Sequence, residues 1–252
     1  MRYVSLGSGS KGNSTLIEHD NRSLLIDCGF SRKNLLVRLQ QAQSDGHQLE
    51  GLLVTHEHSD HAKGAMQVCE LFDIPLYCSA GTAIHMKWTS HRLWNQINCG
   101  DLLDVAGMKV GAVTVPHDAR EPLQFVVEGG GRKLGVLSDL GSLTRRIVDA
   151  YKGCHGLQLE ANHDPDMLKV GPYPPSLQKR VAGPWGHLSN AQCADLIRQV
   201  YWDGVQHITA GHISEKNNHP DLVFGELAQV LGRLAEQVEI LAQDEISGWR
   251  EL

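Results

Sequence analysis

The sequence lacks the features that mark several large classes of protein. Its six cysteines include no C-x-x-C pair, and a chain of 252 residues can bury a core large enough to fold without disulfides. No apolar run approaches the roughly 18 residues that a membrane-spanning helix needs. The first six residues give way to glycine and serine without the apolar stretch of a signal peptide. We therefore expect a cytoplasmic protein with reduced thiols and no membrane association.

Excess positive charge is also absent. Lysine and arginine number 23 against 29 aspartate and glutamate residues, which gives a formal net charge of −6. This balance excludes a protein that binds nucleic acid through overall basicity alone, but it is compatible with a local basic groove. The chain contains no internal repeat, low-complexity tract or linker. Its length therefore predicts one domain that covers residues 1–252.

Hydrophobic patterning predicts short strands in two runs, with helices between them. The expected strands cover residues 2–6, 14–18, 23–27, 51–55, 75–78, 109–115, 123–128, 132–138, 156–160, 206–210 and 238–242. The expected helices cover residues 31–43, 61–72, 80–87, 142–151, 189–201 (with Ser189 as N-cap) and 220–236, and a proline-rich loop covers 171–175. This order predicts an α/β protein whose two sheets carry helices on their outer faces, a four-layer αββα sandwich.

What the sequence does have in unusual number is histidine, at fourteen positions, and the densest group follows the strand 51–55. Residues 55–61 read T-H-E-H-S-D-H, an H-x-H-x-D-H pattern. Side chains two apart on extended backbone point to the same side, so His56 and His58 can bind one cation. Asp60 and His61, at the turn into a helix, can bind a second. Imidazole and carboxylate donors suit zinc, manganese or iron(II), and two such ions can hold a bridging hydroxide and clamp a phosphodiester.

With this motif the sequence resembles the metallo-β-lactamase fold superfamily, and most closely its WalJ/YycJ-type exonuclease group. The matching segments are S-G-S-K-G-N-S at residues 8–14, L-I-D-C-G at 25–29, N-H-D at 162–164, G-H-L-S-N at 186–190 and G-H-I-S-E-K-N-N at 211–218. The order and joint presence of these segments make the resemblance specific, and it spans essentially the whole chain. It implies the αββα metallo-β-lactamase sandwich with two divalent metal ions.

The resemblance also implies the remaining metal ligands, each at the end of an expected strand. They fall on His117, Asp139 and His212, although any one of these residues alone would more often be a cap or a turn residue. The implied sets are His56, His58 and His117 for one ion, Asp60, His61 and His212 for the other, and Asp139 between the two ions.

Two further residues resemble a proton-transfer pair. His187 matches a histidine that relatives of the ribonuclease Z type use near the leaving group, and Glu160 matches its acidic partner. A carboxylate can raise the pKa of a histidine and keep it protonated for donation to the departing oxygen. The alternative for His187 is a residue at a helix N-terminus that binds backbone or phosphate passively. We expect Asp60, His187 and Glu160 to be the catalytic residues.

Substrate contacts are expected from two loops. The glycine- and serine-rich turn at residues 8–14 can present backbone N–H groups to an anion, or it can be a plain hairpin turn. The segment 160–164 reads E-A-N-H-D, with alanine where the family usually has serine, which puts a hydroxyl contact at that position in doubt. The substrate candidates are Ser10, Lys11, Asn13, Asn162 and His163.

The proline-rich region offers a second kind of substrate contact. Lys169, Lys179 and Arg180 can line a track for a nucleic-acid backbone, or they can belong to a solvated loop. Tyr173 or Trp185 can stack on a base, or either can pack the loop. Asp27 is expected to be structural and to hold the loops under the metals. The histidines expected to be ordinary are His19, His47, His85, His91, His155, His207 and His219.

The resemblance implies a 5′→3′ DNA exonuclease that uses a metal-bridging hydroxide. A small-molecule phosphodiesterase or an endoribonuclease with the same centre is the alternative. A thioester or lactam hydrolase is less favoured, because such relatives often lack the Asp60–His61 pair or the His187-type residue and both are present here. A non-catalytic metal-binding protein is less favoured because no expected ligand is missing. Only 20 residues separate Asp139 from Glu160, too few for the long arm of ribonuclease Z. The 72 residues between Asp139 and His212 are too few for an inserted β-CASP domain.

Overall fold

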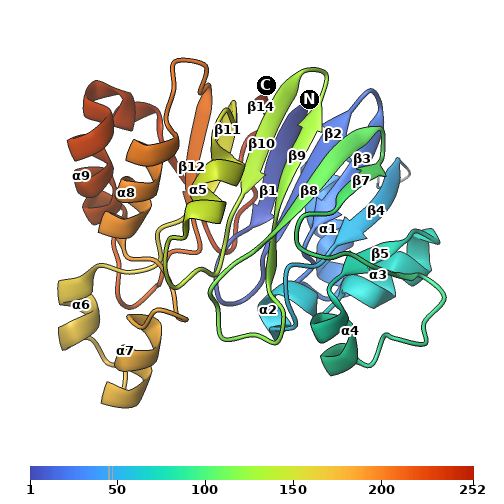
Figure 1. Ribbon diagram of the computed structural model, residues 1–252, viewed down its shortest axis with the longest axis horizontal. Helices are drawn as coiled ribbons and strands as arrows, with labels where there is room; N and C mark the ends of the chain where they lie inside the picture. Colours follow the sequence, from blue (N-terminus) through green and yellow to red (C-terminus); the bar gives the residue numbers. More distant parts are fainter. Residues whose placement is uncertain (45, 47) are drawn as a thin grey trace.

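Two seven-stranded sheets face each other across the middle of the molecule (Figure 1). The computed structural model describes residues 1–44, 46 and 48–252. In each sheet, three antiparallel pairings lie on one side and three parallel pairings on the other. The first sheet has the order β14 (Arg250–Glu251), β1 (Arg2–Gly7), β2 (Ser14–His19), β3 (Arg22–Ile26), β4 (Leu49–Leu53), β5 (Leu76–Cys78) and β6 (Trp94–Gln96). The second has the order β13 (Glu239–Ile240), β12 (His207–Gly211), β11 (Gly156–Glu160), β10 (Arg132–Val136), β9 (Leu123–Gly129), β8 (Met108–Thr114) and β7 (Leu102–Val105).

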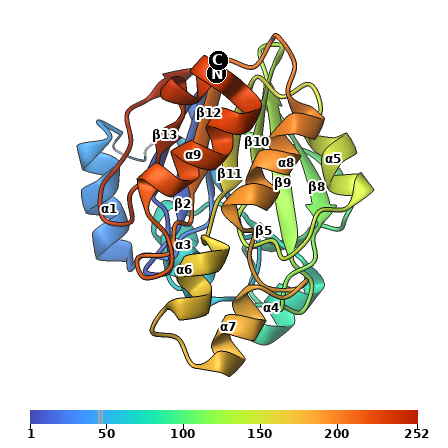
Figure 2. The same ribbon diagram turned by 90° about the vertical axis from the view of Figure 1, so that its left-hand side faces the viewer.

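Helices cover the outer faces of both sheets (Figures 1 and 2). The first half of the chain supplies α1 (Arg32–Gln41), α2 (Ser59–Ala62), α3 (Ala65–Phe72) and α4 (Ala80–Met86). The second half supplies α5 (Arg145–Tyr151), α6 (Pro165–Val170), α7 (Pro175–Val181), α8 (Asn190–Val200), α9 (Pro220–Leu231) and the 3₁₀ helix η1 (Gly232–Gln237). Ser189 caps α8 in a capping box with Gln192, as the sequence predicts. Among the described residues, no helix is both long and apolar enough to cross a membrane.

Three hydrophobic cores fill the spaces between these layers. The middle core joins the inner faces of the two sheets, where Ile26 and Leu53 pack in one cluster with Phe125 and Val127. The other two cores lie under the helices, one beneath α1 and α3 and one beneath α5, α8 and α9. Neighbouring residues of a strand enter different cores because their side chains point to opposite faces of the sheet. The four-layer αββα sandwich predicted from the sequence is therefore confirmed.

The strand ends explain where a site can form. The chain leaves β3, β4, β8, β10, β11 and β12 at one edge of the sandwich, where α/β sheets place ligands. Asp27, Asp139 and His212 follow three of these strands, and all three have left-handed backbone with φ of 61°, 55° and 52°. Non-glycine residues adopt this conformation uncommonly, and it concentrates at functional sites.

The expected single helix over residues 61–72 is wrong, because the chain forms α2 and α3 with a break at Gly64. A Cβ atom on Gly64 would lie 2.0 Å from the carbonyl oxygen of Phe30. The Gly64 N–H also donates a 2.9 Å hydrogen bond to the Cys28 carbonyl oxygen. This close approach to residues 28–30 bends the chain between the two helices.

The proline-rich loop expected at 171–175 is shorter than predicted, because helices lie on both sides of it. Pro165 and Pro175 each occupy the first turn of a helix, where a missing N–H costs nothing and the fixed φ favours helix. The helix expected over 220–236 changes to 3₁₀ geometry at Gly232, where φ is 55°. The expectations also missed β6, β7 and β14, which are short edge strands.

Candidate metal centre

The histidine-rich segment leaves the sandwich directly after β4. His56 is fully buried, and His58, in extended backbone, occupies the N-cap position of α2. Asp60 and His61 belong to the single turn of α2, and the His61 ring is fully buried. The pattern H-x-H-x-D-H therefore changes from extended backbone to helix within its length, as the sequence predicts.

A first group of donor atoms contains three imidazoles and one carboxylate, from His56, His58, His117 and Asp139. His58 Nδ1 lies 3.0 Å from His56 Nε2 and 3.2 Å from His117 Nε2. These spacings approach the roughly 3.3 Å edge of a tetrahedron of nitrogen atoms about 2.0–2.1 Å from one zinc ion. Burial lowers the pKa of all three histidines, which favours the neutral imidazoles that bind cations.

A second group contains Asp60, His61, His212 and the same Asp139. Asp139 Oδ2 lies 2.6 Å from His61 Nε2, and Asp139 Oδ1 lies 2.8 Å from His212 Nδ1. Although burial opposes a positive charge, the Asp139 carboxylate raises the pKa of both His61 and His212. A cation entering this group therefore competes with protons, so binding is coupled to proton release.

The residues present fit a pair of divalent cations. His212 Nε2 is buried without a hydrogen-bond partner, which leaves a lone pair or a proton unsatisfied in the protein interior. Asp139 joins the two groups because its carboxylate belongs to both. Nitrogen and carboxylate oxygen donors of this kind suit zinc, manganese and iron.

Polar residues behind the two groups fix the orientation of the donors. Asp27 Oδ2 lies 2.7 Å from His61 Nδ1, and Asp27 also accepts hydrogen bonds from the backbone and hydroxyl of Thr55. The Gly186 carbonyl oxygen lies 3.1 Å from His117 Nδ1. The hydroxyl of Ser8 accepts a 2.8 Å hydrogen bond from the His212 N–H. The contacts of Asp27 and Gly186 orient imidazole rings, as partners of metal-binding histidines do, and the Ser8 contact holds the backbone of His212.

His187 and Glu160 form a pair beside the second group. Their Nδ1 and Oε1 atoms lie 2.7 Å apart, and Glu160 Oε1 is also 3.0 Å from His212 Nδ1. Burial opposes the charge on His187, but Glu160 and Asp139 raise its pKa to about 9. Burial likewise opposes ionisation of Glu160, but His187 and His212 lower its pKa to about 2. The pair therefore holds a protonated imidazole next to an ionised carboxylate.

Comparison with known families decides what kind of protein carries this centre. The family described as "Beta-lactamase superfamily domain" matches residues 22–213, more than half of the chain. The chain belongs to the β-lactamase superfamily. With the donor groups described above, this membership makes it a metal-dependent hydrolase.

Curated relatives in the superfamily cover nearly the whole chain. One is named exodeoxyribonuclease YycJ, from Bacillus anthracis, and is 33% identical over 92% of this chain and 89% of its own length. Another is named exodeoxyribonuclease WalJ, from Streptococcus pneumoniae, and is 28% identical over 92% of this chain and 88% of its own length. The predicted resemblance to this group is confirmed.

Solved structures of the superfamily share the fold at low identity. The metallo-β-lactamase fold protein YhfI from Bacillus subtilis covers 98% of this chain and 99% of its own, with 14% identity and a TM-score of 0.73. Zinc-bound PqqB from Methylobacterium extorquens covers 100% of both chains, with 17% identity and a TM-score of 0.72.

The five candidate substrate residues differ in their exposure and in their distance from the centre. Ser10 and Lys11 are exposed, and Lys11 Nζ contacts the carboxylates of Glu215 and Asp244. Asn13 lies in the centre, where its Nδ2 is 3.0 Å from His61 Nε2, and the Gly9 N–H donates to its Oδ1. The Asn13 amide is therefore engaged by protein groups.

The other two candidates lie beside the centre. Asn162 Nδ2 donates a 2.8 Å hydrogen bond to the His212 carbonyl oxygen, so this amide supports a donor residue. His163 is buried, and burial lowers its pKa to about 4, which keeps its ring neutral. His163 Nδ1 has no hydrogen-bond partner. The Asn162 amide is thus bound within the protein, whereas His163 Nδ1 is buried without a partner.

The roles of Thr55, which binds Asp27, and of Ser8, which binds the His212 backbone, were not predicted from the sequence. The positions of Thr55 and Ser8 in conspicuous motifs were the available signal. Thr55 directly precedes the histidine motif, and Ser8 begins the segment 8–14. Of the histidines expected to be ordinary, His47 lies outside the described residues. The other six are absent from the two donor groups and from a third possible group, which consists of Asp139, Glu160, His187 and His212.

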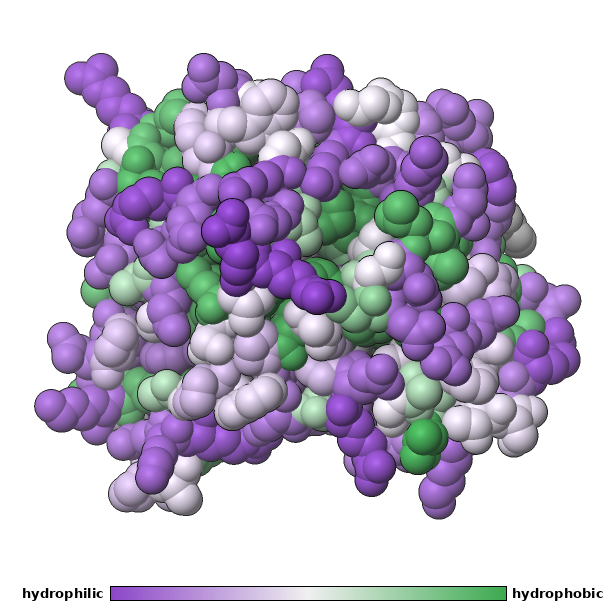
Figure 3. Space-filling view, in the orientation of Figure 1, coloured by the Kyte–Doolittle hydropathy of each residue, from purple (hydrophilic) through white to green (hydrophobic). Residues whose placement is uncertain are grey.

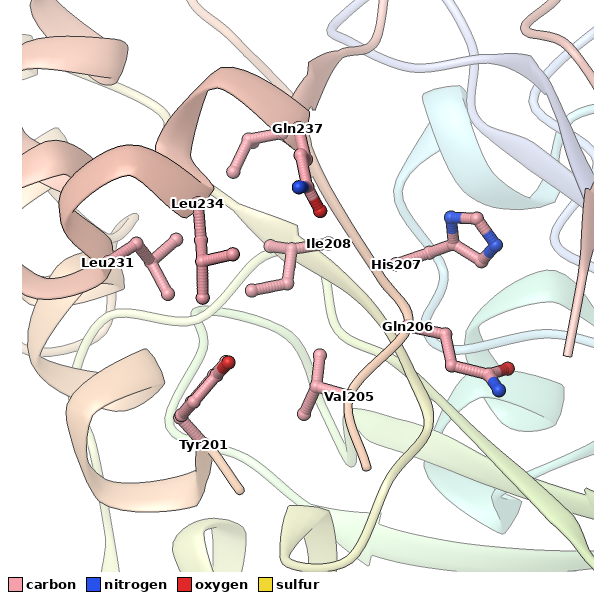
Figure 4. A pocket seen from close by; sticks show the side chains of 9 residues that line it. Tyr201, Val205, Gln206, His207, Ile208, Leu231, Leu234 and Gln237 are labelled. Atoms are coloured by element: carbon pink, nitrogen blue, oxygen red, sulfur yellow. The ribbon is translucent and has the colours of Figure 1, made fainter. Parts of the chain in front are cut away.

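A small pocket elsewhere in the molecule is unrelated to the centre. It lies at the start of β12, where Tyr201, Val205, Ile208 and Leu234 surround about 40 Å³ (Figure 4). The centre lies at the other end of β12, next to His212. The face in Figure 3 is largely hydrophilic, with apolar side chains visible between polar ones.

Proposed function

We propose that this chain is a two-metal phosphodiesterase that acts on DNA as a 5′→3′ exonuclease. The observation that carries the proposal is the pair of donor groups joined by Asp139, with the His187–Glu160 pair beside the second group. The names of the curated relatives, exodeoxyribonuclease YycJ and WalJ, support the choice of DNA as substrate. The resemblance described above is the basis for the 5′→3′ direction.

The donor groups would hold two divalent ions of zinc, manganese or iron. His56, His58 and His117 would hold one ion, Asp60, His61 and His212 the other, and Asp139 both. When bound, such ions supply Lewis acidity for a phosphoryl group and lower the pKa of a water molecule, here to give a bridging hydroxide. They would also offset part of the net charge of −6, so that affinity for phosphate is concentrated at the donor groups.

The chain's own residues supply the proton that the leaving oxygen needs. Glu160 engages Nδ1 of His187, so the proton available for transfer is the one on Nε2. Although burial lowers the pKa of His187, Glu160 and Asp139 raise it to about 9, which favours a protonated imidazole that can donate to the oxygen that departs from phosphorus. The Leu140 and Leu188 N–H groups donate to Glu160 Oε2, which keeps this carboxylate in place.

We propose a cytoplasmic setting, and the thiols support this choice. The described cysteines are all unpaired, which supports a reducing compartment and so the cytoplasm.

A panel of substrates tests the proposal on metal-analysed protein. The substrates are end-labelled single- and double-stranded DNA and RNA, a small phosphodiester (bis-p-nitrophenyl phosphate) and a thioester. We expect 5′ mononucleotide release from DNA. Internal cuts in RNA would support an endoribonuclease instead, and cleavage of the small diester alone would support a small-molecule phosphodiesterase.

Asp60→Ala tests whether two ions are used. The variant should lose hydrolysis and one of two ions per chain, because Asp60 belongs to the second group alone. Asp203→Ala, which removes a carboxylate from an exposed position, is the matched control and should keep both. Full activity of Asp60→Ala with one ion per chain would contradict the two-metal proposal.

A further inference from the structure

Trp185 is an exposed aromatic residue two positions before His187, and the proposed function leaves open whether it stacks on a base or packs its loop. It is 60% exposed, whereas Trp88 in the core is 8% exposed. Exposing an indole ring leaves a large apolar surface in water. An exposed tryptophan beside a catalytic group is therefore a candidate binding residue rather than a packing residue.

Hydrogen bonds hold the backbone around Trp185 rigidly. The Trp185 carbonyl oxygen accepts a 2.9 Å hydrogen bond from the Asp118 N–H, and the Pro184 carbonyl oxygen accepts a 3.1 Å hydrogen bond from the Ser142 hydroxyl. The Gly186 N–H donates to the Gly183 carbonyl oxygen at 2.9 Å. The backbone of Trp185 is held in place while its side chain is exposed, so little backbone entropy is lost when a ligand binds to this side chain.

The same backbone segment contacts both halves of the centre. Gly186, the next residue, places its carbonyl oxygen 3.1 Å from Nδ1 of His117. His187, the residue after that, is the proposed proton donor. Asp118, which binds the Trp185 carbonyl oxygen, directly follows His117 in the chain. The backbone of Trp185 is thus held beside residues that contact His117 and two positions before His187.

The surface around this residue has the charge that a nucleic-acid backbone needs. The segment 165–185 contains α6 and α7, and it carries Lys169, Lys179 and Arg180 against the single acid Asp166. All four side chains are exposed, and Arg180 pairs with the Asp118 carboxylate, which leaves Lys169 and Lys179 as the main cations of this surface in a chain of net charge −6. Figure 1 shows α6 and α7 at the same end of the molecule as α2, which contains Asp60 and His61.

We propose that Trp185 is a stacking platform for an unpaired nucleobase beside the scissile phosphate. The proposal rests on the proposed function and adds a single-stranded substrate end to it. An indole ring stacks on the face of every base, so the platform binds DNA without reading its sequence. The basic residues of α6 and α7 attract the phosphates of the same strand, which makes this attraction sensitive to salt.

A cycle that combines a variant with a modified substrate tests the platform. One substrate is a 5′-phosphorylated ten-residue oligothymidylate. The other is the same strand with abasic residues on both sides of the first scissile phosphate. Wild-type protein should show a KM about tenfold higher for the abasic strand, because it loses the stacking contact. Trp185→Ala should show that higher KM on both strands, with kcat changed much less, and Trp185→Phe should recover part of the difference.

Trp202→Ala is the matched control, since Trp202 is 41% exposed and donates a hydrogen bond to the Cys154 carbonyl oxygen away from the centre. It should behave like wild type on both strands. If Trp185→Ala raises KM equally relative to wild type on both strands, or leaves both unchanged, the platform is overturned while the exonuclease proposal stands. If wild-type protein cleaves neither strand, the exonuclease proposal itself fails, and the platform fails with it.

Discussion

Asp139 is the residue on which the whole centre depends. Its carboxylate reaches His61 at 2.6 Å and His212 at 2.8 Å, and it belongs to both donor groups. Its left-handed backbone, with φ of 55°, turns the chain sharply after β10. A non-glycine residue in this conformation stores strain, which the surrounding contacts must offset. The residue with this uncommon backbone conformation is therefore also the one shared by the two donor groups.

His187→Ala separates proton transfer from metal binding. Removing the imidazole takes away the proposed acid, so phosphodiester hydrolysis should slow roughly 10²-fold or more. Metal content should stay at the wild-type value, as measured by elemental analysis beside the rate. A fall in metal content would instead make His187 a metal ligand. His207→Ala, outside the donor groups, is the control and should change neither value.

Asp27→Asn tests the support behind His61. The carboxylate contacts His61 Nδ1 at 2.7 Å and accepts from the Thr55 N–H, so an amide keeps the shape but removes the charge. Metal affinity should fall by about 10–100-fold, as measured by competition with a chelator. Asp203→Asn, at an exposed position, should leave the affinity unchanged. Unchanged affinity of Asp27→Asn would make Asp27 only a loop support.

At the scale of elements, Gly64 separates α2 from α3 and so sets where the histidine motif ends. Gly64→Ala should lower the free energy of unfolding by about 1–3 kcal/mol, because the added Cβ would overlap the Phe30 carbonyl oxygen. Urea denaturation measures this change. Wild-type stability of the variant would show that the chain can move away from residues 28–30 without cost.

Gly225→Ala is the matched comparison within another helix. Gly225 lies inside α9, and a Cβ there would meet no atom within 4 Å. Alanine favours helix over glycine, so this variant should gain about 0.5–1 kcal/mol of stability in the same urea experiment. A loss would mean that the glycine has a role beyond the space around it.

At the scale of the whole molecule, the layered fold buries five of the six thiols. Burial raises the pKa of Cys28, Cys78, Cys154 and Cys193 to about 12, and it raises that of Cys69 as well. Cys99 is partly exposed beside Arg146. Iodoacetamide at neutral pH should therefore label Cys99 alone in the native protein and all six after denaturation, as counted by mass spectrometry. Rapid native labelling of a second thiol would contradict this packing.

Local patterns explain why much of the site could be predicted from sequence. The spacing of His56, His58, Asp60 and His61 fits one strand end followed by one helical turn, and both features are local. The break at Gly64 was not predictable in this way, because it depends on Phe30, which lies 34 residues earlier. The edge strands β6, β7 and β14 were missed because two to four residues carry too little periodicity.

The sequence by itself determined the fold class and the family resemblance, and through that resemblance it named the residues that lie together in the structure. Only the tertiary structure decided how these residues act together. The contacts of Asp27 with His61, of Ser8 with His212 and of Gly186 with His117 join segments far apart in the chain. No local pattern encodes such contacts, because they exist only after two separate sheets have packed face to face and brought the ends of their strands to one edge.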